Sequence, residues 1–290
     1  MKKMLSIIFS NLSLKRVLLN NQLHFMSTSM YPQFETIIMS KDKNVTKITF
    51  NQADKLNVMN KQFFDDYSEA LRIANVDKDT TITLISHNGK YFSSGIDFEM
   101  FKGLTKEKVN ESSLALTTSI YNVLEEYVYH KKPIVCVVKG PGIDCGLTFL
   151  GIHDYTICSD NVYFYTPLIR YGLPPICFTS YIFPRLMGSV KAKELLLFGK
   201  KITAYEAKNY NIVNEVVNNK EIERVAEEKI KELSSLDKKA LASIRNFVSI
   251  YDKEKLLCVG KKEMDIFRNR LCSDFFYNKL EEVIKKLEKK

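Results

Sequence analysis

The chain has 290 residues, of which 45% are hydrophobic and 27% charged, a composition that supports one large folded domain and excludes global disorder. Its six cysteines form no CxxC pair and its four histidines stand far apart, which predicts reduced, buried thiols and no metal site. No apolar stretch approaches the roughly 20 residues needed to cross a bilayer, so we expect no membrane span.

The first 30 residues combine basic and apolar residues with Ser and Asn and contain no acidic residue. This composition predicts a mitochondrial transit peptide, with a disordered leader as the alternative. Removing its four charges (Lys2, Lys3, Lys15 and Arg16) lowers the formal net charge from +9 to +5. In the rest of the chain Lys alternates with Glu, as on solvated helices. The C-terminal Lys-Leu-Glu-Lys-Lys is not the Ser-Lys-Leu peroxisomal signal.

Short β-rich segments alternate with helical segments after this leader. We expect strands at residues 36–39, 45–50, 81–86, 134–138 and 155–158. The apolar run 134–138 predicts a central strand covered on both faces, reached by a crossover helix at 111–130. The inner side of that helix is expected to carry Leu114, Ile120, Val123, Leu124 and Val128. Repeated βαβ units predict a layered α/β domain.

From about Pro175 the sequence reads as helical almost to its end. Gly188 precedes one helix that opens at residues 189–194, and Thr203 and Glu206 form the capping box of another. Further helices are expected at 220–234, 238–251, 255–270 and 273–289. We therefore predict a leader at 1–30, a core domain at 31–217 and a helical C-terminal region at 218–290.

Two strand-to-helix junctions are candidates for a functional site. The first reads Gly-Lys-Tyr-Phe-Ser-Ser-Gly-Ile-Asp at residues 89–97, and the second reads Lys-Gly-Pro-Gly-Ile-Asp-Cys-Gly at residues 139–146. The N–H groups at a helix start lack intrahelical partners and lie at the positive end of the helix dipole. If the junctions face one another, these donors can share one developing oxyanion. Each junction alone is simply a glycine-rich turn.

Together and in this order, the motifs resemble the enoyl-CoA hydratase/isomerase (crotonase) superfamily over about residues 36–217. Residues 51–60, Asn-Gln-Ala-Asp-Lys-Leu-Asn-Val-Met-Asn, are similar to its early CoA-contacting loop, and residues 92–97 to its first oxyanion motif. Further matches lie at 132–140, 154, 159–160, 199–207 and 213–216. Residues 165–184 most resemble the Δ3,Δ2-enoyl-CoA isomerases (enoyl-CoA delta isomerases) of peroxisomes and mitochondria.

The resemblance implies a ClpP/crotonase-like α/β spiral of ββα units that forms trimers through its C-terminal helices. It implies a fatty acyl-CoA thioester as ligand, with coenzyme A as part of the substrate and no cofactor. The thioester carbonyl would be held by the backbone amides of Ile96 and Cys145. The implied substrate-binding residues are Lys55, Asn57, Ser94, Gly95, Asp97, Gly140 and Leu168. Asp144 is unusual in its motif, because its charge disfavours an oxyanion unless the side chain points away or is protonated.

One expected catalytic group is missing. Moving a double bond along an acyl-CoA requires a base to take the C2 proton and an acid to return a proton at C4. In the isomerases that this chain resembles a glutamate does this, and the matching position is Ile176, in Gly-Leu-Pro-Pro-Ile-Cys at 172–177. The two glutamate positions of the hydratases match Thr148 and Leu168. Substitute groups are Asp144, Tyr165, Tyr171 and Cys177.

Three functions remain open at this point. The first is an acyl-CoA isomerase of fatty acid β-oxidation, in the mitochondrial matrix or alternatively the peroxisome, working through a substituted base. The second is a catalytically inactive acyl-CoA-binding or scaffold member, in a homotrimer or in a mixed oligomer with active relatives. The third is RNA binding through the lysine-rich helices, which the alternation of Lys with Glu disfavours. We therefore expect no nucleic-acid partner.

Overall fold

A computed structural model describes residues 31–249 and 252–287, so the transit peptide predicted at residues 1–30 lies outside the described part of the chain. Backbone contacts divide the chain into Met1–Gln33 and Phe34–Lys290. All elements described below belong to the second unit, and the predicted boundary at residue 217 stays a prediction. Among the described residues, no helix has both the length and the apolar character that crossing a bilayer requires.

A six-stranded sheet lies at the centre of Phe34–Lys290, with the strand order β1-β2-β3-β4-β6-β9. Its strands are β1 (Ile37–Asp42), β2 (Val45–Phe50), β3 (Ile82–His87), β4 (Ile134–Val138), β6 (Tyr155–Ser159) and β9 (Glu215–Val217). β1 and β2 pair antiparallel, and each later pair is parallel. Parallel neighbours require crossover connections, which place helices on the faces of the sheet.

Alternate residues of the central strands face two separate apolar cores. In β4, Ile134, Cys136 and Val138 belong to the larger core, whereas Val135 and Val137 belong to the smaller one. All five residues of this strand are buried, as its apolar run predicted. A strand covered on both faces is the central strand of a layered α/β fold.

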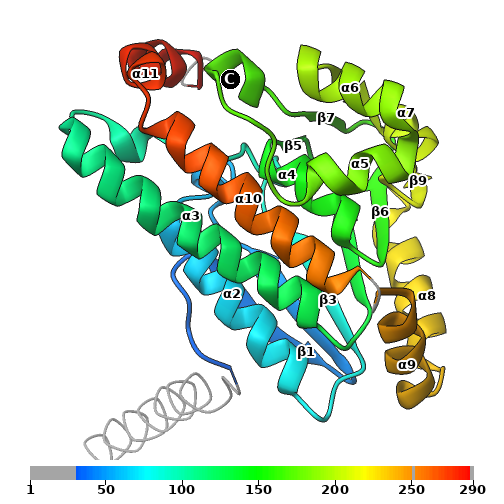
Figure 1. Cartoon of the computed structure of the whole chain (residues 1–290). Coiled ribbons are helices and arrows are strands. Elements are labelled where there is room, and N and C mark those ends of the chain that lie inside the picture. The colour runs from blue at the N-terminus through cyan, green and yellow to red at the C-terminus, as the bar shows by residue number, and fades with distance from the viewer. Residues whose placement is uncertain (1–30, 250–251, 288–290) are drawn as a thin grey trace, which may run out of the picture. The chain divides into compact units, whose positions relative to one another are not determined.

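Three long helices lie on the side of the larger core: α2 (Lys61–Val76), α3 (Lys106–Tyr129) and α10 (Lys253–Leu271), with α10 lying along α3 (Figure 1). α2 begins where the Asn60 side chain accepts a hydrogen bond from the Phe63 amide at 2.9 Å. The crossover helix α3 was predicted, and four of its five inner residues are buried. Leu114 is 48% exposed, so its inward assignment was wrong.

The smaller core is covered by α8 (Ile222–Ser234), whose Ile222 and Ala226 pack against β3, β4 and β6. The remaining elements are α4 (Cys145–Thr148), α5 (Thr179–Met187), α6 (Ser189–Phe198), α7 (Ala204–Asn209), α9 (Lys238–Ser249), α11 (Asp274–Leu287) and the short 3₁₀ turns η1 (Ala53–Lys55), η2 (Phe98–Phe101), η3 (Phe149–Ile152) and η4 (Leu168–Tyr171). The capping box predicted for Thr203 and Glu206 is present at the start of α7.

A second sheet of three short strands has the order β5-β7-β8. Its strands are β5 (Gly142–Ile143), β7 (Tyr163–Tyr165) and β8 (Lys201–Thr203). The expectation that nearly everything after Pro175 is helical was therefore wrong at β8 and β9. Both strands have only three residues, too few for a period-two pattern to be recognised.

Candidate functional site

The two strand-to-helix junctions lie side by side. Ser93 and Gly142 form a β-bridge, and the Ile143 amide donates to the Ser93 carbonyl at 2.9 Å. A Cβ on Gly146 would lie 3.1 Å from the Ser93 Cβ, so glycine permits this close approach. The sequence placed both junctions at strand ends, and the structure brings them into direct contact.

Asn57 organises the first junction. Its Nδ2 donates to the carbonyls of Asn88 and Tyr91, both at 2.8 Å, and its Oδ1 accepts from the Gln52 amide at 2.8 Å. Its carbonyl accepts from the Ser93 hydroxyl at 2.8 Å. Asn57 is only 1% exposed, so its polar groups hold the loop together. Sequence reasoning had assigned this residue to substrate binding.

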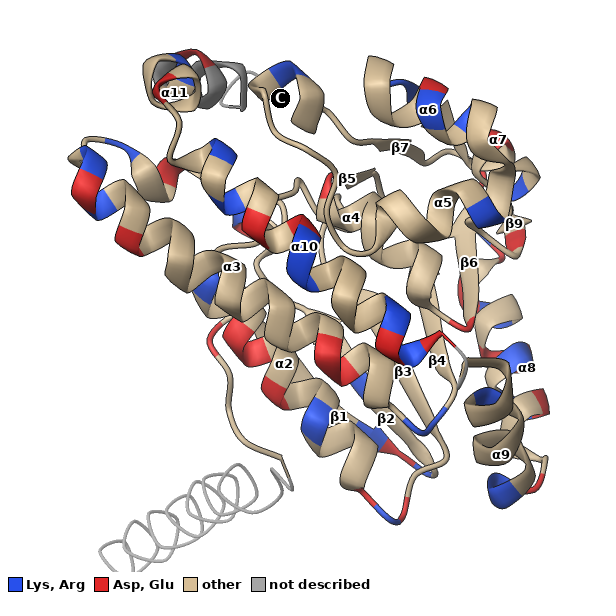
Figure 2. Cartoon of the chain, viewed as in Figure 1, with Lys and Arg blue, Asp and Glu red and all other residues tan. Residues whose placement is uncertain are grey.

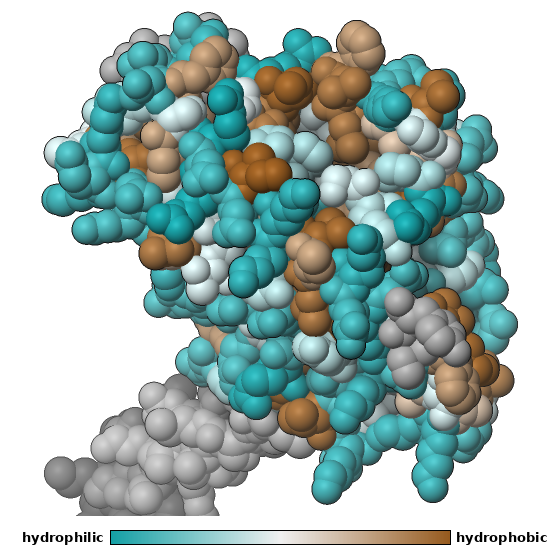
Figure 3. All heavy atoms as spheres, in the orientation of Figure 1, coloured by the Kyte–Doolittle hydropathy of each residue, from teal (hydrophilic) through white to brown (hydrophobic). Residues whose placement is uncertain are grey.

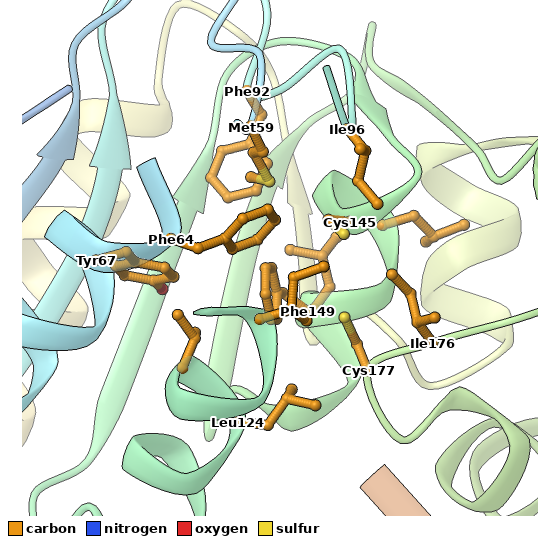
Figure 4. Close-up of a cluster of buried hydrophobic side chains, with 14 of the residues drawn as sticks. Met59, Phe64, Tyr67, Phe92, Ile96, Leu124, Cys145, Phe149, Ile176 and Cys177 are labelled. Atoms are coloured by element: carbon orange, nitrogen blue, oxygen red, sulfur yellow. The ribbon is translucent and has the colours of Figure 1, made fainter. Parts of the chain in front are cut away.

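The proposed oxyanion donors are both buried at this contact. Ile96 follows Gly95, whose φ of +95° favours glycine, and Ile96 is 2% exposed. Cys145 is the first residue of α4, where a backbone N–H has no intrahelical acceptor. In Figure 4 the Cys145 side chain lies between those of Ile96 and Cys177.

The Asp144 side chain turns into this contact. Its Oδ2 accepts a long hydrogen bond of 3.4 Å from the Ile96 amide, and the residue is 3% exposed. The arrangement in which Asp144 points away from the oxyanion donors is therefore not the one observed. Its backbone has φ +54° and ψ −115°, outside the regions that residues with a Cβ normally occupy.

The position at which the resemblance implies a glutamate is buried among apolar groups. Ile176 and Cys177 are fully buried and lie near Phe149 and Cys145 (Figure 4). Cys177 and Phe178 have φ of +62° and +61°, so the chain enters α5 through two strained residues. The ring of Phe178 packs where Gly260 of α10 has no side chain, because a Cβ there would lie 2.5 Å from that ring.

Glu263 on α10 holds the start of α5. Its carboxylate accepts from the amides of Phe178 at 2.7 Å and Ser180 at 2.9 Å, and from the Ser180 hydroxyl at 2.5 Å. Burial raises the pKa of Glu263 to about 7, while these donors act in the opposite direction. Sequence reasoning missed this residue, because nothing in the sequence connects α10 with a turn about 85 positions earlier.

Two titratable groups near the site hold their protons tightly. Burial, with minor contributions from Tyr165 and Asp144, raises the pKa of Tyr171 to about 12. Burial also raises the pKa of the Cys145 thiol well above its usual value, and contact with Cys177 adds to this. Both groups therefore stay protonated at neutral pH. Thr148 and Leu168, at the hydratase glutamate positions, are buried as well.

The other predicted binding residues are divided between exposed and structural positions. Lys55 is exposed on η1, and the half-buried Ser94 donates its amide to the Leu56 carbonyl at 3.0 Å. The Asp97 side chain caps η2 by accepting from the Glu99 amide at 3.0 Å, and burial raises the pKa of Asp97. Gly140 lies against the Lys90 carbonyl.

An apolar cavity of about 360 Å³ lies beside the site, between η4, α5 and α6. Leu168, Leu173 and Pro175 line it, whereas Ile96, Cys145 and Ile176 do not. Figure 2 shows few charged residues on α4 and α5, whereas many lie along α3, α8 and α10. Within the described part of the chain, no cluster of three His, Cys, Asp or Glu side chains is placed to bind a metal.

Comparison with known proteins identifies the family. The model of the enoyl-CoA hydratase/isomerase family matches residues 40–288. The chain belongs to the enoyl-CoA hydratase/isomerase family. A member of this family, enoyl-CoA delta isomerase 2 from Homo sapiens, is 32% identical over 241 residues, which cover 83% of this chain and 61% of that protein.

A second family member, the peroxisomal enoyl-CoA delta isomerase 3 from Mus musculus, is 32% identical over 231 residues, which cover 78% of this chain and 71% of that protein. The chain therefore spans about three fifths of the length of the human relative and somewhat more of the mouse one. An enoyl-CoA hydratase/isomerase structure from Pseudoalteromonas atlantica T6c superposes with a TM-score of 0.78 at 24% identity, covering 87% of this chain and 98% of that one. The α/β crotonase fold with a helical C-terminal region is thereby confirmed.

Proposed function

We propose that this enoyl-CoA hydratase/isomerase family member binds a fatty acyl-CoA thioester between its two junctions and isomerises enoyl-CoA slowly at best. The observation that supports the proposal is the contact between residues 92–97 and 142–146, across which the Ile96 amide donates to Asp144, the residue before Cys145. Coenzyme A belongs to the substrate, and the reaction uses no cofactor. Similarity to the enoyl-CoA delta isomerases supports this class of ligand.

The slow rate follows from Ile176. A positioned acid or base contributes about 10²–10⁴-fold to a rate, whereas an oxyanion donor contributes about 10²–10³-fold. A site that keeps the backbone donors but has an isoleucine at the acid/base position retains only the second contribution. Of the possible substitute bases, Tyr171 holds its proton too tightly to replace the carboxylate.

The test is a double-bond isomerisation assay with a 3-enoyl-CoA, followed by the absorbance of the conjugated 2-enoyl thioester. Ile176→Glu should raise the rate over the unsubstituted protein, because a carboxylate would then face the substrate. Ile176→Gln is the matched control, since it brings similar size and polarity without a titratable group. An unchanged rate for Ile176→Glu, with unchanged affinity for CoA esters, contradicts the proposed position of the site.

A catalytically inactive scaffold is the second candidate, and the Asp144 carboxylate beside the Ile96 amide favours it. Such a member would act in a homotrimer or in a mixed oligomer with active relatives. Large apolar side chains are exposed on α6 and α9, and Figure 3 shows hydrophobic side chains at the lower right, over α9. They are Val190, Leu197, Phe198, Ile244, Phe247 and Val248. Sedimentation of the full chain tests the homotrimer, because a trimer has three times the 33.5 kDa chain mass.

For the compartment, we propose the mitochondrial matrix, with the peroxisome as the alternative. The acid-free, basic leader at residues 1–30 supports the mitochondrion. Fusing these residues to a fluorescent protein should direct it to mitochondria. A diffuse or peroxisomal signal would contradict the assignment.

A further inference from the structure

We propose that Asp144 is a specificity-determining residue whose carboxylate competes with the thioester oxygen for the Ile96 amide. The thioester oxygen would then bind the Ile96 amide only after the Asp144 side chain has moved away from it. The proposal rests on the acyl-CoA site proposed above, and it adds an internal competitor for that site.

The competition follows from where the carboxylate lies. Asp144 Oδ2 accepts from the Ile96 amide, one of the two donors expected to bind the thioester oxygen. A carboxylate oxygen and a carbonyl oxygen both accept, so a single N–H cannot serve both with good geometry. At 3.4 Å the existing bond is long and therefore weak.

Main-chain hydrogen bonds hold the backbone of Asp144 in place. Its amide donates to the Tyr165 carbonyl at 2.7 Å, and its carbonyl accepts from the amides of Leu147 and Thr148, both at 2.9 Å. The φ of +54° and ψ of −115° then direct the Cβ toward the first junction. The contact is tight, because a Cβ on Gly95 would lie 2.7 Å from the Asp144 Cβ.

The surroundings keep the carboxylate close to the donors. Asp144 is 3% exposed, so turning away from the Ile96 amide does not lead directly into water. Burial is the main cause that raises the pKa of the Cys145 thiol and of the Tyr171 hydroxyl, and the Asp144 charge adds to it in both. A ligand oxygen carrying partial negative charge would meet this same carboxylate charge, which disfavours the thioester further.

A comparison of two ligands measures the competition. An acyl-CoA thioester presents a carbonyl oxygen, whereas the matching S-alkyl-CoA thioether lacks it and needs no oxyanion donor. We expect calorimetric titration of the full chain to show nearly equal affinities for the two compounds. In Asp144→Gly the thioester should bind roughly tenfold more tightly than the thioether, because the Ile96 amide becomes available to its oxygen beside the Cys145 amide.

Asp144→Asn is the second variant, because it keeps the size of the side chain and removes its charge. Its preference for the thioester should lie between those of the unsubstituted protein and Asp144→Gly. The amide resonance of Ile96 gives an independent readout in protein labelled with ¹⁵N-isoleucine. It should shift on substitution of Asp144, and in Asp144→Gly it should shift again on addition of thioester but not of thioether.

The outcomes separate this inference from the proposed function. If both compounds bind and Asp144→Gly leaves their affinity ratio unchanged, the competition is refuted while the acyl-CoA site stands. If neither compound binds to any of the three proteins, the acyl-CoA site itself is refuted and the competition with it. A thioester preference of tenfold already present in the unsubstituted chain would also refute the competition.

Discussion

The first wall of the site, Asn57 with residues 92–97, and the second wall, residues 142–148 with 176–180, are held by different means. In the first wall positive φ angles fall on Gly95 and Asn57, residue types that adopt them at low cost. In the second wall they fall on Asp144, Cys177 and Phe178, none of which is glycine or asparagine. The first wall contains Ile96, whereas the second wall contains Cys145 together with Asp144 and Ile176.

The largest expected effect is at Gly140, where the two walls are joined. A Cβ at this residue would lie 2.1 Å from the Lys90 carbonyl oxygen, so the backbone would have to move. We expect Gly140→Ala to lower the free energy of unfolding by about 3 kcal/mol, measured by chemical denaturation. Gly103→Ala is the control: its φ is +71° but no atom lies within 4 Å, so strain alone should cost about 1 kcal/mol.

If Gly140→Ala is no more destabilising than Gly103→Ala, the two junctions are not packed as closely as described. Both walls would then be free to move apart. The proposal that the Ile96 and Cys145 amides bind the same oxygen would then be contradicted.

The next largest effect concerns Glu263, which accepts hydrogen bonds from the second wall. Its pKa is raised to about 7 in the folded protein from an ordinary value of 4.5, so its stabilising contribution is present below pH 4.5 and is lost as the pH rises through 7. Glu263→Gln removes this dependence. Relative to that variant, the unsubstituted protein should lose about 2 kcal/mol of unfolding free energy between pH 5 and pH 8.

Buried histidines change the unfolding free energy with pH in the opposite direction, and their contribution must be subtracted. Burial lowers the pKa of His87 to about 4 and of His153 to about 3, so their contribution is present above pH 6.5 and is lost as the pH falls. Both proteins contain them, so the difference between the proteins isolates Glu263. Glu254→Gln, an exposed position on the same helix, should leave the pH profile unchanged. Equal profiles for Glu263→Gln and Glu254→Gln would show that Glu263 does not fasten α5.

The smallest expected effect tests the strain at Cys177. Cys136 and Cys177 are both fully buried, but only Cys177 has a positive φ. Cys136→Gly in β4 should cost about 2 kcal/mol, because it removes packing and admits glycine into a strand. Cys177→Gly should cost about 1 kcal/mol less, because glycine relieves the strained backbone. Equal losses in thermal or chemical denaturation would contradict that strain.

Much of the fold could be predicted from local pattern. β2 and β4 have the bounds that their β-rich segments indicated, and the capping box of α7 was correct. The helix α2 was not predicted at all, although Asn60 supplies an N-cap side chain. The exposed Leu114 on α3 shows that helical spacing identifies a face only to within about one residue.

The site was predictable only in outline. The glycine-rich junctions could be found, because strand ends followed by glycine have a local signature. The direction of the Asp144 side chain could not, because it depends on φ and ψ angles that only the packed structure fixes. The role of Asn57 in holding the loop also required the structure, since its partners Asn88 and Tyr91 lie more than 30 residues away.

A crystal structure of the full chain with a bound acyl-CoA tests the central claim most directly. The account predicts the thioester oxygen about 3 Å from the backbone nitrogens of both Ile96 and Cys145, with the Asp144 carboxylate moved off the Ile96 amide. It is contradicted if those two nitrogens point in different directions or if the thioester lies elsewhere on the protein.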